Sequence, residues 1–328
     1  MNSPQKKILF IHNYPAKFVI IDRDILKERY EVTEHCFSKK IFNPLKTITQ
    51  VATHDIVFIW FASWYAFWPL LLARVFGKKS IVAAGGYETV NVPAINFGFQ
   101  RNKLKSFMVK TNLFLAHQVI FASQFSFSES VNNVKLPVSK AKMIYHGLRA
   151  SDYPYYEQKE PFVITVGKVN QEDLERKGLR LFVLAAKYLP NTKFVVIGEW
   201  QDKAIDTLRS LAGPNVHLIN FIPERELFEY FKKAKVYVQA SQHEAFGLSL
   251  AEAMLSGCVP VVTNLCALPE VVGDAGIYTK STDPKDIAEA IKKALSADVE
   301  WSRKARSRIQ NLFPIEKRKE AFFQLIEN

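Results

Sequence analysis

Short runs rich in β-branched and aromatic residues alternate along the whole chain with longer stretches whose apolar residues recur at helical spacing. This alternation is typical of a parallel β-sheet covered by helices, because parallel neighbours need a crossover connection between them. The sequence therefore predicts an α/β fold. The expected strands are residues 8–11, 56–61, 80–83, 119–122 and 143–145 in the first half, and 162–166, 193–197, 216–218, 236–239, 259–263 and 276–278 in the second.

Residues 148–161 interrupt this alternation near the middle of the chain. They contain Pro154 and Pro161 and several tyrosines, and their apolar residues follow no period. Such a segment is typical of a linker. Since 328 residues suffice for two domains, we expect two doubly wound, Rossmann-like domains that face a cleft. They would span residues 1–150 and 151–328, with a last helix near residues 315–328 that can pack back on the first domain.

Composition and hydropathy exclude several classes of protein. Apolar residues make up 48% of the chain and charged residues 23%, as in an ordinary globular protein. Three cysteines are too few for a disulfide framework, and no segment resembles a signal peptide. Residues 56–73 are uncharged but contain Ser63 and Pro69, so we expect a buried strand and then a core helix opening at Pro69 rather than a membrane span. We expect a cytoplasmic protein.

The net charge of +12 is confined to one half of the chain. Residues 1–150 hold 20 Lys and Arg against 8 Asp and Glu, whereas residues 151–328 hold 24 of each. Such asymmetry indicates an anionic partner for the first domain: a membrane surface, a phosphorylated substrate or nucleic acid.

Two glutamates flank the start of an expected helix in the second half. Glu244 lies in the loop after the strand at residues 236–239, a helix begins near Phe246 and Gly247, and Glu252 lies in its second turn. Gly247 lets the backbone approach a ligand closely, and the first N–H groups of a helix form an anion site. Carboxylates only accept hydrogen bonds, which suits sugar hydroxyl groups.

Basic residues stand at two other strand and helix ends of the second half. Gly167 and Lys168 follow one strand, and Lys177 and Gly178 open the next helix. Taken singly, each lysine fits a solvated surface better than a site. Their order and spacing together with the two glutamates favour binding of a diphosphate.

The segment Glu244-Ala-Phe-Gly-Leu-Ser-Leu-Ala-Glu252 resembles the signature of retaining glycosyltransferases of family 4, the glycosyl transferases group 1. Val166-Gly167-Lys168 and Lys177-Gly178 resemble the Gly-Arg and Lys-Gly elements of that family. The resemblance covers nearly all of residues 160–328 and is weaker over residues 1–150.

The resemblance implies the two-domain GT-B fold, with a nucleotide sugar held mainly by the second domain. It implies that Glu244 contacts the hexose, that Glu252 contacts the ribose, and that the amides of Phe246, Gly247 and Leu248, with Lys168 and Lys177, hold the diphosphate. It also implies retention of configuration without a metal or other cofactor. The donor remains open between UDP-, GDP- and ADP-sugars.

The first domain departs from the family pattern. Many relatives have a histidine after the strand that here ends near residue 83, where this chain has Gly85, Gly86 and Glu88. We expect the two glycine amides to take its place and Glu88 to reach a hydroxyl group. His12-Asn13 and His146 also follow expected strands and are candidates for the acceptor or the cleft; for both histidines a structural role is equally compatible with the sequence.

The basic first domain would meet the acceptor, a glycan or a lipid-linked glycan. Phe97, Phe99, Phe107, Trp64 and Trp68 lie near its basic residues in sequence. Basic and aromatic residues together suit an anionic membrane surface, so the protein could be peripheral at the inner face of the cell membrane. Nucleic acid is disfavoured because no recognised module accompanies the charge. The alternative function is an inactive GT-B-like protein that binds a nucleotide sugar or nucleic acid.

Overall fold

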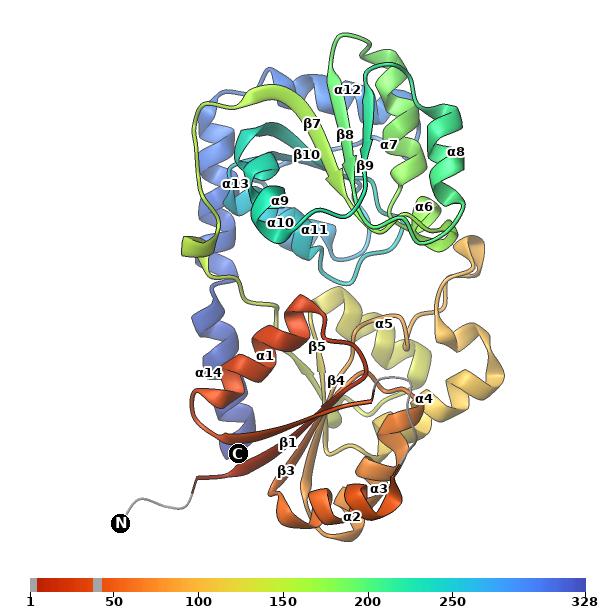
Figure 1. The fold of residues 1–328 in the computed structure, drawn as a ribbon, viewed down its shortest axis with the longest axis vertical. Coiled ribbons are helices and arrows are strands. Elements are labelled where there is room, and N and C mark those ends of the chain that lie inside the picture. The colour runs from red at the N-terminus through yellow and green to blue at the C-terminus, as the bar shows by residue number, and fades with distance from the viewer. Residues whose placement is uncertain (1–4, 38–42) are drawn as a thin grey trace. The chain divides into compact units, whose positions relative to one another are not determined.

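The computed structural model describes residues 5–37 and 43–328, and the chain divides into two compact units. Unit 1 comprises residues 1–146 together with residues 316–328, and unit 2 comprises residues 147–315 (Figure 1). The change of unit thus comes a few residues before the expected boundary at residue 150. The last helix is part of unit 1.

Within the described residues, unit 1 holds a sheet of six parallel strands in the order β2-β1-β3-β4-β5-β6. Alternate residues of its central strands face opposite layers of helices. Phe10 and Phe58 stack on one face, where Phe322 of the last helix meets Phe58 at 5.6 Å between ring centroids. The strands are β1 (Lys7–His12), β2 (Glu31–Cys36), β3 (Ile56–Trp60), β4 (Lys79–Ala83), β5 (Gln118–Phe121) and β6 (Ala141–Met143).

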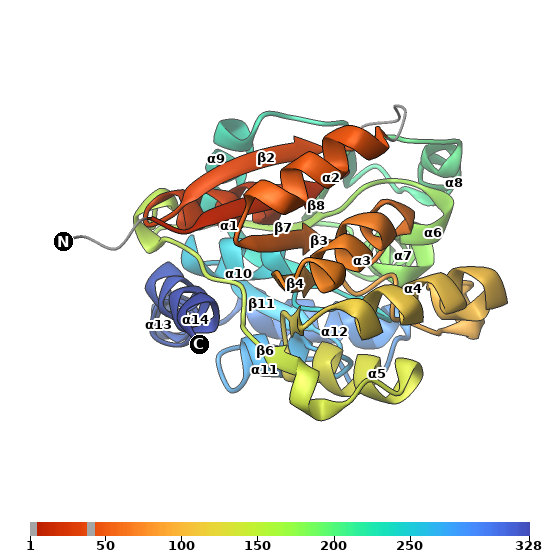
Figure 2. The same cartoon turned by 90° about the horizontal axis from the view of Figure 1, so that it is seen from below.

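The opposite face of this sheet is covered by a layer of helices. Leu9 and Val57 belong to a core cluster that includes Val51, Leu70 and Val109 of three helices that pack in succession, α2 against α3 and α3 against α4 (Figure 2). The helices of unit 1 are α1 (Lys17–Lys27), α2 (Pro44–Thr53), α3 (Phe67–Val75), α4 (Lys103–Leu115), α5 (Gln124–Val134) and α14 (Ile315–Glu327).

Helix α14 is fixed to unit 1 by a buried ion pair. Arg318 donates to the two carboxylate oxygens of Asp22 in α1, at 2.6 and 2.7 Å, and to the carbonyls of Ile144 and Tyr145. The indole N–H of Trp60 donates to the same carboxylate at 3.1 Å. Because a buried charge is costly without partners, this network attaches the end of the chain firmly to its beginning.

Unit 2 repeats the architecture with the strand order β12-β11-β10-β7-β8-β9, again parallel throughout its described strands. One core cluster joins the sheet to α7, α8 and α12. The strands are β7 (Glu160–Val166), β8 (Lys193–Ile197), β9 (Val216–Ile219), β10 (Ala234–Gln239), β11 (Val259–Val262) and β12 (Ile277–Tyr278). The helices are α6 (Gln171–Arg176), α7 (Leu179–Ala185), α8 (Ala204–Leu211), α9 (Glu224–Lys233), α10 (Leu248–Leu255), α11 (Leu268–Val272), α12 (Pro284–Leu295) and α13 (Val299–Leu312).

Two strand predictions need correction. The strand β2 was not predicted, because this edge strand is half-exposed along its length and lacks a continuous apolar run. The last strand of unit 1 ends at Met143, not at residue 145, because its pairing with β5 places Ala141 opposite Val119 and Met143 opposite Phe121. The uncharged residues 56–73 do form a buried strand and a core helix, which opens at Phe67, two residues before Pro69.

Candidate active site

Helix α10 begins directly after the acidic loop, as predicted. Gly247 precedes it with φ at +95°, in the left-handed region that a side chain would strain. Phe246 is buried against Phe313, with ring centroids 5.2 Å apart. The first N–H groups of a helix have no intrahelical partner and carry the positive end of its dipole. The start of α10 at Leu248 is therefore suited to an anion.

Glu244 stands at the centre of a polar network before that helix. Its carboxylate lies 3.9 Å from the Lys177 ammonium and accepts a hydrogen bond of 3.2 Å from the Gln239 amide. Gln239 is buried at the end of β10 and is itself oriented by Tyr237, whose hydroxyl donates to its carbonyl at 2.9 Å, and by the Ser241 hydroxyl at 2.6 Å. These contacts fix the direction of the Glu244 carboxylate.

Two glycines allow close approaches around Lys177. A Cβ at Gly167 would lie 2.7 Å from Cδ of Lys177, so the glycine lets the lysine side chain pass close over the backbone that follows β7. Gly178 has φ at +67°, and a Cβ there would come within 2.1 Å of the Ala240 carbonyl. This packing brings Gly167, Lys177 and Glu244 close to one another.

Lys168 is placed differently from Lys177. It is exposed on the residue after Gly167, whereas the Lys177 side chain is only 19% exposed. Of the two candidate lysines, Lys177 is thus the one enclosed by unit 2 beside the Glu244 carboxylate, while Lys168 reaches solvent.

Arg176 braces the acidic loop from the end of α6. The Arg176 guanidinium donates to Asp173 at 2.8 Å and to the His243 carbonyl at 3.4 Å. The backbone carbonyl of Arg176 accepts from the backbone N–H of Gln242 at 2.8 Å. Burial lowers the pKa of Arg176, but the negative charges of Glu244 and Asp173 outweigh that effect and raise it. Arg176 thus adds a permanent positive charge beside Glu244.

Glu252 projects from the second turn of α10 and is buried, 7% exposed. The Tyr153 hydroxyl donates to its Oε1 at 3.1 Å. Burial, and then the charge of Glu252, raise the pKa of Tyr153 so that its phenol stays protonated. Unit 2 therefore combines two oriented carboxylates, which accept from hydroxyl groups, with a helix N-terminus and lysine that attract an anion.

The candidates of unit 1 follow strands β1, β4 and β6, whose carboxyl ends share one edge of the sheet. His12 is buried at the end of β1, and its Nε2 lies 2.8 Å from Glu34 of β2. Asn13 is exposed and accepts a hydrogen bond of 3.3 Å from the Tyr65 hydroxyl.

The loop after β4 differs from expectation. Glu88 is 3% exposed, and its carboxylate accepts from the amides of Gly85 at 3.0 Å and Ala62 at 3.4 Å, and from Gly86. Burial raises the pKa of Glu88 although these bonds partly offset it. The amides that were expected to replace a histidine are thus engaged by Glu88, and Glu88 holds the loop instead of reaching outward. This arrangement arises because a buried carboxylate takes the nearest backbone donors.

His146 is packed between aromatic rings at the last residue before unit 2. Its ring lies 5.5 Å from Phe18 and 6.3 Å from Trp60, nearly parallel to the latter. Burial, with the charge of Arg318 adding to it, lowers the pKa of His146 well below its usual value. His146 is therefore neutral at pH 7.

Three residues of the site were missed by sequence reasoning: Gln239, Arg176 and Tyr153. A glutamine at the end of an otherwise apolar strand was the sequence feature that could have indicated Gln239. Nothing in the expected linker distinguished Tyr153 from its neighbours. Within residues 5–37 and 43–328, no group of three His, Cys, Asp or Glu residues could hold a metal ion. Among the helices that the structure describes, none has the length and apolar character needed to cross a bilayer.

Most of unit 2 matches a known family model. Residues 156–311 match the model of the family described as Glycosyl transferases group 1. The chain is 32% identical over 111 residues to O-antigen chain mannosyltransferase B of Escherichia coli, covering 33% of this chain and 29% of that protein. It is 25% identical over 236 residues to a phosphatidylinositol N-acetylglucosaminyltransferase subunit of Arabidopsis thaliana, covering 69% and 51%. The matches thus span about half or less of these two relatives.

The fold is shared with a solved structure over almost the whole chain. Anabaena Alr3699/HepE in complex with UDP and glucose superposes with a TM-score of 0.81, at 14% identity, covering 98% of this chain and 100% of that one. Residues 156–311 therefore resemble the glycosyl transferases group 1 family, and the two parallel α/β units of the chain have the GT-B fold.

Proposed function

We propose that this chain is a retaining glycosyltransferase that moves a hexose from a nucleotide diphosphate sugar to a glycan or lipid-linked acceptor. The observation that carries the proposal is the convergence of Glu244, Lys177 and the N-terminus of α10 in unit 2. Relatives named as mannosyltransferase and N-acetylglucosaminyltransferase, and a structural neighbour that holds UDP and glucose, support the same chemistry.

Each part of the site has a role in this proposal. Glu244 accepts from the hexose hydroxyls, and Glu252 accepts from the ribose. The amides of Phe246, Gly247 and Leu248 bind the diphosphate together with Lys177 and the exposed Lys168. Arg176 keeps the acidic loop in place and adds positive potential.

In the proposed reaction, the bond between the anomeric carbon and the diphosphate oxygen breaks, and its electron pair leaves with the diphosphate. The acceptor oxygen forms the new bond on the same face of the sugar and gives its proton to the departing phosphate. The protein stabilises the charge that develops on the leaving group through preorganised donors. We expect activity without an added divalent metal, because lysine and helix dipole supply the positive charge.

The first test is nucleotide binding followed by turnover. UDP-, GDP- and ADP-sugars are compared by thermal shift, where a ligand at about 100 times its Kd stabilises the protein by roughly 2.7 kcal/mol. Release of nucleoside diphosphate is then measured with a panel of glycan and lipid-linked acceptors, with and without EDTA. Binding without transfer or hydrolysis across the panel would favour the inactive binding protein instead.

Glu244→Gln tests the role of the acidic loop. We expect kcat/KM to fall by roughly 10- to 100-fold, since a hydrogen bond to a charged group contributes about 1.5–3 kcal/mol, while free nucleotide binds as before. Glu289→Gln, at an exposed carboxylate of α12, is the matched control. Equal losses for free nucleotide and nucleotide sugar would contradict a contact between Glu244 and the hexose.

We also propose that unit 1 docks on an anionic membrane that carries the acceptor. Between Asp55 and Glu129 the sequence has a single acidic residue, Glu88, and that residue is buried. The same stretch forms α3 and α4, which pack side by side and expose large apolar side chains (Figure 2). These are Trp64, Trp68, Val75, Phe76, Leu104, Phe107 and Phe114, among the basic residues Arg74, Lys78, Arg101, Lys103, Lys105 and Lys110.

Only the exposed apolar side chains near these basic residues could enter a membrane surface. Leu104 is 78% and Phe107 is 70% exposed, whereas Phe97 is buried and Phe99 is half-buried under Lys105, whose ammonium lies 4.7 Å from its ring. Exposed apolar side chains without neighbouring carboxylates suit the interface of an anionic leaflet, where each Lys or Arg contributes about 1 kcal/mol.

Co-flotation with phosphatidylglycerol and with phosphatidylcholine vesicles tests this surface. We expect binding to the anionic vesicles at low salt, and a loss of several-fold in the double variant Leu104→Ser, Phe107→Ser. Phe221→Ser is the control, because Phe221 is equally exposed, at 71%, but belongs to unit 2. Flotation that persists undiminished at high salt would exclude the electrostatic mechanism.

A further inference from the structure

The segment that opens unit 2 before β7, residues 147–159, contacts the helix that carries Glu252. Tyr153 of this segment is 4% exposed, and its hydroxyl donates to Oε1 of Glu252 at 3.1 Å. Its ring packs on Phe228 of α9, with centroids 4.9 Å apart. The Tyr153 side chain therefore lies among the helices of unit 2, and its polar end meets the carboxylate to which we assign ribose binding.

The backbone around Tyr153 is also held against α10. Arg306 of α13 donates to the carbonyls of Tyr153 at 3.1 Å and Ala150 at 3.3 Å, and to the carbonyl of Leu255, the last residue of α10. One guanidinium thus joins the linker segment to the end of the helix, while the Tyr153 phenol joins it to the second turn. The position of the phenol relative to Glu252 is fixed at two points.

A buried carboxylate needs such a donor. A Glu252 side chain that is 7% exposed has little water around it, and an undirected carboxyl group would rotate among several geometries. A carboxylate offers about four lone-pair positions. The Tyr153 phenol occupies one of them, and in the proposed function the vicinal hydroxyls of a ribose donate to others.

We propose that Tyr153 is a positioning residue that makes the nucleotide site specific for ribose by fixing the Glu252 carboxylate. The inference rests on the proposed function, in which Glu252 binds the ribose. It adds a residue from the first segment of unit 2 to the nucleotide site. Tyr153 acts through Glu252 and has no direct contact with the ligand in this proposal.

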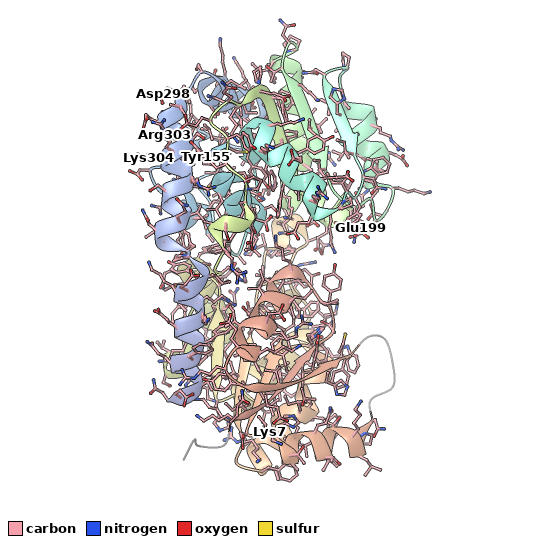
Figure 3. All side chains as sticks on the ribbon, turned by 60° about the vertical axis from the view of Figure 1, so that its left-hand side comes forward. Lys7, Tyr155, Glu199, Asp298, Arg303 and Lys304 are labelled. Atoms are coloured by element: carbon pink, nitrogen blue, oxygen red, sulfur yellow. The ribbon has the colours of Figure 1, made fainter. Side chains whose placement is uncertain are left out.

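The test deletes one hydroxyl. Tyr153→Phe is compared with Tyr155→Phe, which removes a hydroxyl two residues away that is buried without a hydrogen-bond partner among the described residues. Tyr155 lies beside α13 (Figure 3), with the Arg306 guanidinium 5.1 Å from its ring centroid. Both changes preserve an aromatic ring in the same segment, so Tyr155→Phe controls for packing.

The probes are the nucleoside diphosphate, among UDP, GDP and ADP, that binds the unaltered protein most tightly, and its 2′,3′-dideoxy analogue. In calorimetry we expect Tyr153→Phe to weaken the ribonucleotide about tenfold, equivalent to about 1.4 kcal/mol, and the dideoxy analogue less than threefold. The donor KM should rise with kcat nearly unchanged. In a Glu252→Gln background, Tyr153→Phe should have no further effect, because its target is gone.

Four results would overturn the inference. An equal loss for both probes, or no loss for either, would show that Tyr153 does not act on ribose recognition. A further loss in the Glu252→Gln background would show that it acts through another group. If the unaltered protein binds none of the three diphosphates, the proposed function fails, and the inference fails with it. This outcome can be told from the others because it appears before any substitution is made.

Discussion

The two units share an architecture and a number of cations but differ in their carboxylates. Each has a sheet of six parallel strands among its described residues. Unit 1 holds 22 Lys and Arg against 11 Asp and Glu, whereas unit 2 holds 22 against 21. The net charges are therefore +11 and +1. The positive character of unit 1 arises from missing carboxylates rather than from additional lysines.

The carboxylates are also used differently in the two units. In unit 1, Asp22 is buried against Arg318 and Glu88 is buried against backbone amides, so both serve the fold. In unit 2, Glu244 lies beside Lys177 and Glu252 accepts from Tyr153, both around α10. The buried carboxylates of unit 1 thus hold its own fold together, whereas Glu244 and Glu252 of unit 2 lie near the start of one helix.

The largest expected effect is a loss of stability in unit 1 that leaves ligand binding in unit 2 unchanged. Arg318→Met leaves Asp22 buried without its cation and should lower the free energy of unfolding by about 3–5 kcal/mol. Arg303→Met is the control, because its pair with Glu157 is half-exposed and should contribute less than about 1 kcal/mol. Denaturant unfolding measures both, and nucleotide affinity of the folded protein should be unchanged. A loss of nucleotide affinity in Arg318→Met would contradict the proposal that this ion pair serves only the stability of unit 1.

The second effect concerns binding in unit 2. Lys177→Ala should weaken nucleotide sugar binding by about 1.5–3 kcal/mol, because the diphosphate loses a charge-assisted contact. Lys203→Ala, at an exposed lysine of the same unit, should leave the affinity as it is. Calorimetry with the best donor is the measurement. Unchanged affinity in Lys177→Ala would remove this lysine from the site.

The smallest effect is a pH dependence in unit 1. Burial raises the pKa of Glu88 above its usual value of 4.5, so the folded protein holds the proton more tightly than the unfolded chain. Stability should therefore fall as pH rises from about 4.5 toward the folded pKa, by at most about 1.4 kcal/mol per pH unit. Glu88→Gln should remove this slope, and its stability relative to the unaltered protein should grow over that pH range. Parallel pH curves would show that Glu88 is not the titrating group.

The fold class and the centre of the site could be predicted from the sequence because their signals are local. Apolar runs of strand length identified all the strands except β2, and the spacing of Glu244, Gly247 and Glu252 placed the start of α10 correctly. The edge strand β2 could not be found, since its residues satisfy neither a buried run nor a strict alternation. The predicted position of strand β6 was wrong because the pairing with β5, which sets its register, is not visible in the sequence.

The partners of the site residues could not be predicted, because they are distant in sequence. Tyr153 and Glu252 are 99 residues apart, and Asp22 and Arg318 are 296 apart. Glu88 also behaved differently from expectation, since only the folded loop shows that the amides of Gly85 and Ala62 lie within its reach. No local sequence pattern indicates that residues so far apart in the chain will come into contact.

The amino-acid sequence by itself determined the alternation of strands and helices, the charge difference between the halves, and the acidic motif at a helix start. These follow from propensity, periodicity and count, which need no third dimension. Only the tertiary structure decided which groups meet: that Lys177 passes over Gly167 to Glu244, that Tyr153 directs Glu252, and that Glu88 is enclosed. Hydrogen bonds and burial depend on distances of a few ångströms between remote segments, and folding alone sets those distances.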